Sequence, residues 1–481
     1  MDDKLWSRRA FLATLARTTG GAAMLGLAGC GGSPQPQASP TPLSKVPASI
    51  IEEAKQFKGR SLTAIAQQLY FAAANDAYAQ GLSDFAQQTG TIITNTNINV
   101  DTGNFVAKQD AAVKAGNVQD MATAAASRFV AQLHQLDDIV PVTDTVNQME
   151  KIYGPTADAN RINLFLGGQW WGIPFYSSGS GWFIRKDWLQ EKGIKESGLK
   201  SFKDARDIAL EVSDPSQNRF GWGSTVNRSG DGNGFILSVM NAYGSSITAD
   251  NGRKVIFNSP ETIEAITFLA DIYTNSKYKK MLPPGILSWT DSSNNEAWLA
   301  GIIGFTNNAY SLYAQSKVQK NPVYDKTLTW PGFTGPGTDT VINTGDCLAF
   351  VVFKGAREPD FAKLLAQYLV DGDVMLNMVK ASHGLILPAY DRIWHSDPYY
   401  LNGDPIFSTL YKILTQKLPI ATKTGLHFPQ SPSPGIQAVN QSYVLTDMMG
   451  DIIQKGVKVK DAVTTANQRM LDIFDQLGIK Q

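Results

Sequence analysis

The sequence predicts an α/β fold, because short apolar runs alternate with segments of helical period along most of the chain. Two features support this prediction most strongly. Residues 348–353 are apolar without interruption, which is typical of a strand covered on both faces of a sheet. Residues 361–369 carry an apolar stripe at helical spacing just after Pro359, as expected of a helix that packs on such a sheet.

The first elements of the predicted fold lie in the N-terminal third of the chain. Residues 61–66 and 92–100 have the composition or alternation of strands, and residues 76–89 between them have a helical pattern. A further strand is predicted to end at residues 119–122, and residues 129–136 are predicted to form a helix. This order of elements is typical of an α/β protein.

Clear start signals mark the helices predicted further along the chain. Ser201 begins a variant of the capping box, with Asp204 at its third helical position. Ser259 stands before Pro260, which combines a good cap residue with a proline at the first helical position. An amphipathic pattern over residues 463–474 predicts the last helix.

The composition excludes several classes of protein. The 481 residues contain 43 Lys and Arg against 43 Asp and Glu, so the chain has no basic excess with which to bind nucleic-acid phosphates. Two cysteines, Cys30 and Cys347, are too few for a disulfide-stapled scaffold. The histidines are scattered and show no zinc-binding spacing. The sequence therefore predicts no nucleic-acid partner, no metal and no cofactor.

Residues 1–29 are predicted to be an export signal. A basic start is followed by a small, apolar stretch that is too short and too polar to be a good membrane span. The run SRRAFL at 7–12 resembles a twin-arginine motif, and LAGC at 27–30 resembles a bacterial lipobox. The resemblance implies lipidation of Cys30, whereas the choice between the twin-arginine and the general secretory route stays open.

Residues 30–58 are predicted to be a lipid-anchored linker. Its first part is rich in Pro, Ser and Gln and lacks the apolar residues that a core needs, so it forms an extended spacer. Lipid attachment at Cys30 followed by a spacer would hold the protein at the outer face of a bacterial membrane, in the periplasm or at the cell surface.

A series of short motifs resembles one known family. The run WGIPFY at 171–176, followed by IRKDWL at 184–189, is similar to a segment of the extracellular solute-binding proteins of ABC importers, in the family 1 cluster that contains maltose-binding protein. Weaker matches follow in the family's order, at 200–204, 251–261 and 298–305. The similarity covers residues 60 to 480.

The resemblance implies a two-lobed, periplasmic-binding-protein-like α/β fold with a hinge between the lobes. The N-terminal lobe would comprise residues 59–174 and 327–357, and the C-terminal lobe residues 175–326 and 358–481. The chain would cross between lobes near residues 173–178 and 329–333 and near Glu358. Such a protein is a monomer that captures a solute between its lobes and delivers it to membrane permease subunits, without catalysing a reaction.

The residues of the predicted site fit a mono- or oligosaccharide. A sugar presents hydroxyl groups and apolar C–H faces, so its site needs flat aromatic rings beside amide or carboxylate groups. Segments expected to reach the cleft carry that mixture: Trp171, Tyr176, Trp222, Trp289, Asp291, Asn307, Asn308 and Asp346. The resemblance adds Arg128 as a polar contact, Tyr310 and Tyr443 as aromatic contacts, and Ser178 where some relatives have an acidic group. Core packing for Trp222, a turn cap for Asp346 and a surface charge for Arg128 remain alternatives.

Other functions are compatible with parts of the sequence. A secreted carbohydrate-active enzyme would need paired carboxylates, for which Asp291 and Asp346 are the candidates. A receptor for a polyamine would need a cleft rich in carboxylates, and one for an organic phosphate a cleft rich in Arg or Lys. Residues 231–234 resemble the start of a calcium loop, but the ligand spacing that follows does not fit one. The sequence leaves the identity and length of the sugar and the cognate permease open.

Overall fold

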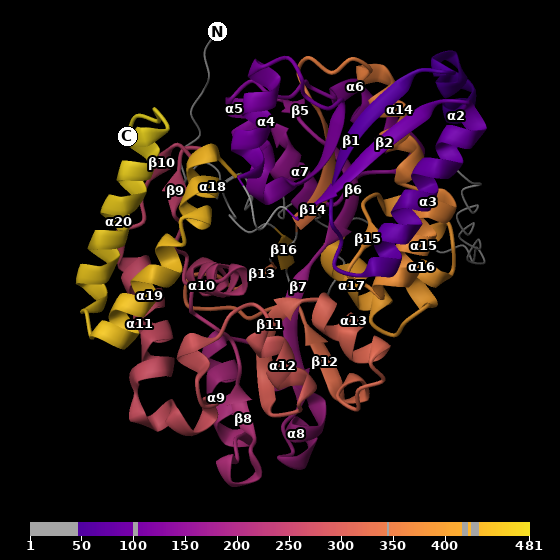
Figure 1. The fold of residues 1–481 in the computed structure, drawn as a ribbon. Helices are drawn as coiled ribbons and strands as arrows, with labels where there is room; N and C mark the ends of the chain where they lie inside the picture. Colours follow the sequence, from indigo (N-terminus) through magenta and orange to yellow (C-terminus); the bar gives the residue numbers. More distant parts are fainter. Residues whose placement is uncertain (1–46, 100–103, 344–345, 416–421, 425–431) are drawn as a thin grey trace, which may run out of the picture. The chain divides into compact units, whose positions relative to one another are not determined.

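Two larger β-sheets with helices packed against them organise the part of the chain that the computed structural model describes, which comprises residues 47–99, 104–343, 346–415, 422–424 and 432–481 (Figure 1). The predicted export signal, Cys30 and the first part of the predicted linker lie outside these residues. Among the described residues, no helix has both the length and the apolar character needed to cross a membrane.

The six-stranded sheet has the strand order β15-β6-β14-β3-β1-β2. Its strands are β1 (Ser61–Gln67), β2 (Ile92–Ile98), β3 (Met121–Ala125), β6 (Ile173–Ser178), β14 (Asp346–Val352) and β15 (Leu387–Pro388). Strand β1 runs parallel to β2 and β3, whereas β14 runs antiparallel to β3 and β6. Helices α3 (Ala72–Thr89), α14 (Pro359–Leu369) and α15 (Gly372–Ser382) pack with this sheet and with one another (Figure 1). The apolar β14 is buried, which confirms the prediction of a covered strand.

The four-stranded sheet has the order β12-β7-β11-β8. Its strands are β7 (Ser180–Arg185), β8 (Phe220–Trp222), β11 (Ile303–Ala309) and β12 (Thr327–Trp330). Helices α9 (Phe202–Val212), α10 (Gly230–Ala242) and α11 (Pro260–Thr274) belong to this half, together with α19 (Val444–Lys455) and α20 (Val459–Gln476), which pack on α11 (Figure 1). Trp182 on β7 lies at the centre of the aromatic core of this half, where its ring contacts those of Trp222, Phe235 and Phe333.

Shorter elements complete the described structure. The helices are α2 (Ala48–Ala54), α4 (Phe105–Lys114), α5 (Ala131–Gln135), α6 (Thr143–Tyr153), α7 (Asp158–Leu164), α8 (Lys186–Glu191), α12 (Ser293–Leu299), α13 (Ser311–Val318), α16 (Tyr399–Asn402), α17 (Phe407–Leu414) and α18 (Pro434–Gln441). The short strands are β4 (Phe165–Leu166), β5 (Gln169–Trp170), β9 (Thr248–Ala249), β10 (Lys254–Val255), β13 (Val341–Asn343) and β16 (Thr422–Thr424). A π-helical turn, η3 (Ala126–Val130), precedes α5, where the sequence predicts a continuous helix.

The predicted helix starts are confirmed. Ser201 and Asp204 form a reciprocal capping box at the start of α9. The hydroxyl of Ser259 accepts a hydrogen bond from the backbone of Thr262 and so caps α11, in which Pro260 is the first residue. These caps satisfy backbone N–H groups that have no partner inside the helix, so local sequence alone fixes where the two helices begin.

The chain passes from one sheet to the other directly after residues 173–178, near which the sequence predicts the first crossing. Strand β6 belongs to the six-stranded sheet and β7 to the four-stranded one, and Gly179 alone separates them. Two segments are placed differently from the predicted lobes. Strand β12 lies in residues 327–357, which were predicted to belong to the N-terminal lobe, but it pairs with β7 of the four-stranded sheet. Elements α14, α15 and β15 lie in residues 358–481, which were predicted to belong to the C-terminal lobe, but they pack with the six-stranded sheet. Sheet membership depends on long-range pairing, which the pattern within a strand does not specify. The boundaries at which the lobes move stay a prediction.

Glu358 also belongs to the first half rather than to a crossing. Its carboxylate lies 2.7 Å from the guanidinium of Arg60, and its backbone N–H donates to the carboxylate of Asp120 at 3.0 Å. Both partners lie on or next to strands of the six-stranded sheet. The chain therefore continues in the first half beyond Glu358, through α14, α15 and β15.

Candidate functional site

Polar side chains gather on both sides of the crossing from β6 to β7. Asp346 pairs with Ser178 at the end of β6, and Asn308 pairs with Gly181 at the start of β7. Ser178 and Gly181 are separated along an extended chain by roughly 10 Å, at about 3.3 Å per residue. One side chain from each sheet, both predicted from the sequence, therefore lies beside the same short stretch of backbone.

Asp346 is the centre of a polar group that belongs to the six-stranded sheet. Its Oδ2 accepts a hydrogen bond from the hydroxyl of Ser127 at 2.5 Å, and its Oδ1 accepts from the backbone N–H groups of Ser127 at 3.1 Å and Cys347 at 2.8 Å. Burial raises the pKa of Asp346, against the opposing effect of the hydrogen bonds from Ser127. With its oxygens engaged in this way, Asp346 holds the η3 turn in place and leaves little capacity for a ligand.

Asn163 completes this group, which we call the Asp346 group (Ser127, Asn163 and Asp346). The amide nitrogen of Asn163 lies 3.4 Å from Oδ1 of Asp346, and its own Oδ1 is buried without a hydrogen-bond partner among the described residues. A buried acceptor without a partner lowers the stability of the fold, so a hydrogen-bond donor on a bound molecule would be favourable here. A ligand hydroxyl would provide one.

A second polar group belongs to the four-stranded sheet. Oδ2 of Asp231, in the first turn of α10, accepts from the side-chain amides of Asn294 at 3.0 Å and Asn308 at 3.3 Å. Asp291 accepts from the backbone N–H of Asp231 at 2.8 Å and from that of Gly230 at 3.3 Å, and so caps α10. We call these residues the Asp231 group (Asp231, Asp291, Asn294 and Asn308).

Burial, with repulsion from Asp291, raises the pKa of Asp231 to about 7, although the hydrogen bond from Asn294 opposes the change. The unfolded chain should have a pKa of about 3.9 at this residue. The native state therefore binds this proton more tightly than the unfolded state, so the contribution to stability is complete below about pH 4 and is lost as the pH rises through 7.

We expect Asp231→Asn to remove this pH dependence while keeping an acceptor for Asn294. Between pH 4 and 7 the free energy of unfolding of the wild type should fall by at most about 4 kcal/mol more than that of the variant. Each tenfold change in proton affinity corresponds to about 1.4 kcal/mol. Urea unfolding at each pH measures the difference, with Asp137→Asn as an exposed control. Parallel stability curves for Asp231→Asn and the wild type would contradict the expectation.

Helix α18 contacts structures next to both groups. The side chain of Gln437 accepts from the backbone of Gln132 at 3.2 Å and donates to the carbonyl of Ala126 at 3.4 Å, next to Ser127. From the other half, the side-chain amide of Asn233 on α10 donates to the carbonyl of Asn440 at 2.9 Å. The two polar groups are thus linked both through the crossing and through α18.

Several predicted site residues lie near these groups and are partly exposed. Arg128 follows Ser127 and is exposed, with its guanidinium over the ring of Phe129 at 4.9 Å. Asn307 donates from its side chain to the carbonyl of Gly181 at 3.3 Å. Tyr443 is half-buried under the guanidinium of Arg228, 5.1 Å from its ring centroid. These contacts place the three residues without showing that any of them binds a ligand.

Two predicted tryptophans lie in different surroundings. Trp171 is half-buried and stacks on His134 with ring centroids 3.7 Å apart, while its indole N–H donates to the carbonyl of Leu166. Trp289 is 9% exposed, and its carbonyl accepts hydrogen bonds from the side chains of Thr225 and Asn227. The ring of Trp171 thus already has a stacking partner in its own half, and the side chain of Trp289 is nearly buried.

Three predicted aromatic contacts are packed inside the protein. Trp222 is fully buried in the core of the second half, and its indole N–H donates to the hydroxyl of Tyr273 at 3.2 Å. Tyr176 is also buried, within β6. Tyr310 is 1% exposed and lies against the crossing, so that a Cβ at Gly179 would be 3.0 Å from its ring. All three rings are buried in this structure, and their role in ligand binding stays a prediction.

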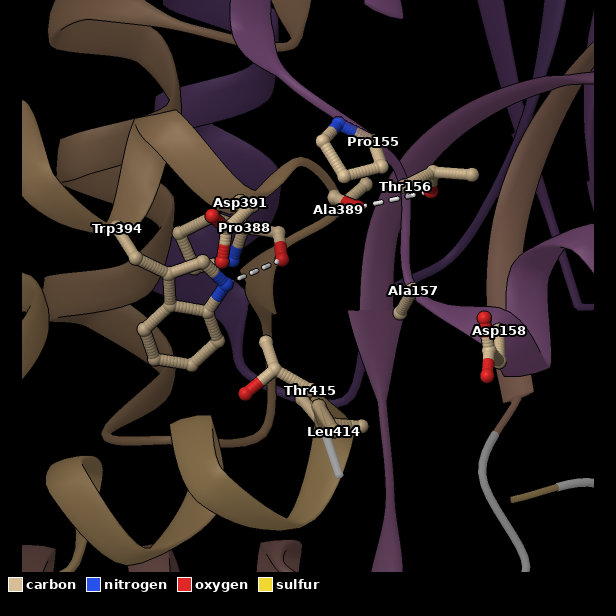
Figure 2. A pocket seen from close by; sticks show the side chains of 10 residues that line it. All are labelled: Pro155, Thr156, Ala157, Asp158, Pro388, Ala389, Asp391, Trp394, Leu414 and Thr415. Atoms are coloured by element: carbon tan, nitrogen blue, oxygen red, sulfur yellow. Dashed lines mark hydrogen bonds between the residues drawn. The ribbon is translucent and has the colours of Figure 1, made fainter. Parts of the chain in front are cut away.

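A pocket of about 360 Å³ lies beside the crossing (Figure 2). It is lined by Pro155, Thr156, Ala157, Asp158, Pro388, Ala389, Asp391, Trp394, Leu414 and Thr415. The hydroxyl of Thr156 donates a hydrogen bond to the carbonyl of Ala389 at 2.8 Å, and the indole N–H of Trp394 donates one to the carbonyl of Pro388. Both hydrogen bonds can be followed in Figure 2. Asn160 on α7 connects the pocket to β6 by donating to Thr156 and to Ser177.

The described residues contain no group of three or more His, Cys, Asp or Glu side chains that could hold a metal ion. Cys347 is buried and free, and burial raises the pKa of its thiol. The side chains of Ser127, Asn163 and Asp231 were not among the predicted contacts. The cap residue Ser229, just before a glycine-rich helix start, is a sequence signal that could have drawn attention to Asp231. No local sequence signal indicates Asn163.

Solved structures with the same fold come from several bacteria. A solute-binding protein from Thermotoga lettingae bound to α-D-tagatose matches with 17% identity and a TM-score of 0.68, over 86% of this chain and 100% of that one. Maltose-bound MalE3 from T. maritima matches with 15% identity and a TM-score of 0.69, over 86% and 100%. A protein from Agrobacterium radiobacter K84 in complex with ribitol matches with 15% identity and a TM-score of 0.69, over 87% and 99%.

These likenesses show that the fold is that of the two-lobed solute-binding proteins of ABC transporters. No curated protein sequence is significantly similar to this chain. The model of the family described as bacterial extracellular solute-binding protein matches residues 62–373, which is more than half of the chain. The chain therefore belongs to the bacterial extracellular solute-binding proteins.

Proposed function

We propose that this protein binds a neutral carbohydrate or polyol between its two halves and delivers it unchanged to an ABC permease. The observation that carries this proposal is the position of the Asp346 and Asp231 groups on the two sides of the crossing. Together they carry hydroxyl and amide groups from both sheets, held in place by the carboxylates of Asp346 and Asp231. Hydrogen-bonding groups of this kind suit a ligand rich in hydroxyls. The sugars and polyols in the similar structures support the same class of ligand.

The charges at the site favour a neutral ligand over the charged alternatives. A polyamine would need free carboxylates, yet Asp346 and Asp291 both accept hydrogen bonds from backbone N–H groups. An organic phosphate would need several cations, and neither polar group contains Lys or Arg. Amide side chains such as Asn163 and Asn308 instead offer both donors and acceptors without net charge.

The same contacts disfavour a glycoside hydrolase. A hydrolase needs one carboxylic acid to give a proton to the leaving group and one carboxylate to act as base or nucleophile. Asp346 holds the η3 turn, and Asp291 caps α10. Neither of these two carboxylates is held ready for proton transfer, and Oδ2 of Asp231, whose pKa is raised by burial, is engaged by the amides of Asn294 and Asn308. We therefore propose capture without turnover.

Three further parts of the proposal concern how the protein works in the cell. A lipid on Cys30 would hold it at the outer face of the membrane, and the linker to residue 58 would let it reach the permease. A separate ATPase would supply the energy for transport through the permease subunits, and the binding protein would act as a monomer. Globomycin-sensitive processing together with a mass shift on Cys30 tests the anchor directly.

A ligand panel tests the proposed function. We expect at least one of tagatose, maltose, ribitol, mannitol and mannobiose to raise the thermal midpoint by several degrees, because a ligand that binds only the native state stabilises it. Chromatography of the same mixtures should show the sugar unchanged. Cleavage products would favour the enzyme, and stabilisation by spermidine or glycerol phosphate but by no sugar would exclude the proposed ligand class.

A further inference from the structure

A buried carboxylate outside the site joins the two halves of the structure. Asp404 lies between α16 and α17, and its side chain is completely inaccessible to solvent. Its Oδ1 accepts from the hydroxyl of Tyr313 at 2.8 Å, and its Oδ2 accepts from the hydroxyl of Tyr324 at 2.9 Å and from the ammonium of Lys317. We call these four residues the Asp404 anchor (Tyr313, Lys317, Tyr324 and Asp404).

The donors of the Asp404 anchor come from the half that contains the four-stranded sheet. Tyr313 and Lys317 lie on α13, which follows β11 after a single residue. Tyr324 lies in the turn that leads directly into β12. Strands β11 and β12 both pair with β7. Three side chains from two different strand ends of one sheet thus converge on a single carboxylate.

The acceptor belongs to the other half. Strand β15, upstream of Asp404, pairs with β6 of the six-stranded sheet. After β15, the guanidinium of Arg392 donates to the carbonyl of Ile152 at the end of α6 at 3.2 Å. Downstream, the hydroxyl of Tyr411 on α17 donates to Asp391 at 3.0 Å, which fixes α17 on the segment that precedes it. Asp404 is therefore held within the first half on both sides.

Separating the Asp404 anchor would be costly. A buried carboxylate with a single ammonium partner becomes an uncompensated charge when that partner leaves. Burial and the contact with Asp404 raise the pKa of Tyr313, so its hydroxyl keeps the proton that it donates. The rings of Tyr313 and Tyr324 also pack on each other, with centroids 4.9 Å apart. The contact is thus electrostatically balanced and closely packed.

A second contact between the halves involves the same helix but is much weaker. The hydroxyl of Tyr70, after β1, donates to the side chain of Gln315 on α13 at 3.3 Å. Tyr70 is 57% exposed. A neutral hydrogen bond between accessible groups contributes little, because water replaces it when it breaks. Helix α13 is therefore held firmly at Lys317 and loosely at Gln315.

We propose that the Asp404 anchor is the fixed pivot on which the two halves turn, and that the Tyr70–Gln315 contact opens and closes as they move. Rotation about a pivot lets the polar groups at the crossing separate and approach while α13 keeps its place against α16 and α17. This inference does not depend on the ligand being a carbohydrate.

Electron paramagnetic resonance distances between spin labels test the pivot in the full chain without ligand. One label pair, K108C with K192C, reports on the two halves far from the Asp404 anchor, and a second pair, V318C with N402C, reports next to it. Each of these four positions is exposed. Cys30 is replaced by Ser, and Cys347 is too buried to react.

We expect Tyr70→Phe to broaden the distance distribution of the distant pair only slightly, because that contact is weak, while the pair at the Asp404 anchor keeps the wild-type width. Asp404→Asn should broaden both, and Tyr324→Phe should do so to a smaller extent if Asp404→Asn does not fold. Asp137→Asn, which removes the same charge from an exposed ion pair with Lys354, should change neither. Wild-type widths for both pairs in Tyr324→Phe and in a folded Asp404→Asn would overturn the proposal. So would broadening of the pair at the Asp404 anchor by Tyr70→Phe.

Discussion

Replacing Asp346 by Ala is expected to weaken ligand binding by at least about tenfold, or roughly 1.4 kcal/mol. The carboxylate of Asp346 holds the hydroxyl and the backbone of Ser127 and lies beside the amide of Asn163. Without it, the two residues that we expect to contact the ligand lose their common support. Calorimetric titration with the sugar that stabilises the protein most would measure the loss.

Two further variants separate this effect from a general loss of stability. The Asp346→Ala protein should also unfold more easily, by roughly 2 to 4 kcal/mol, because buried N–H groups lose their acceptor. Titration well below the unfolding temperature keeps that effect apart. Asp346→Asn retains one acceptor oxygen and should recover part of the affinity, and the exposed Asp137→Ala should bind as the wild type does. Wild-type affinity in Asp346→Ala would remove the Asp346 group from the site.

Replacing Tyr310 by Ala is expected to lower the free energy of unfolding by about 3 to 5 kcal/mol, as for other large buried aromatic residues. Its ring lies against Gly179 and Gly181 at the crossing and packs edge-on against Phe183 at 5.8 Å. The cavity left behind would open next to the backbone that joins the two sheets. Urea unfolding measures the change.

Tyr310→Phe is the matched control, because it keeps the ring and removes only the hydroxyl. Within the part of the chain that the structure describes, that hydroxyl is buried and has no hydrogen-bond partner. Its removal should therefore leave stability unchanged or slightly increased. If Tyr310→Ala unfolded like the wild type but no longer bound ligand, the residue would be a ligand contact, as the resemblance implies, and not a support for the crossing.

Local signals in the sequence were sufficient for much of the fold. Ser201 and Ser259 predict the starts of two helices correctly, because an N-cap is formed by residues only three positions apart. The region of the crossing was also predictable, since the resemblance places the crossing near a Gly-Ile-Pro segment, which forms the start of β6. In contrast, the sequence does not reveal that β12 joins β7, because the choice of a partner strand depends on residues more than 100 positions away.

The site was predictable only in part. Asp346 and Asn308 were predicted and do lie beside the crossing, yet their binding role stays a prediction. Trp222 has the residue type of a sugar platform, but three-dimensional packing buries it against Trp182 and Phe235. An aromatic ring suits a core and a sugar face equally well, so its residue type does not decide between the two. Asn163 becomes visible only through its distance to Asp346.

Hydrogen exchange with and without the best ligand of the panel tests the central claim most directly. If a carbohydrate is held between the halves, it should slow amide hydrogen exchange in both halves together. The peptides that carry Ser127 and Asn163 and those that carry Asp231 and Asn308 should all be protected. Protection of one half alone, or only of the residues that line the pocket containing Trp394, would contradict the account.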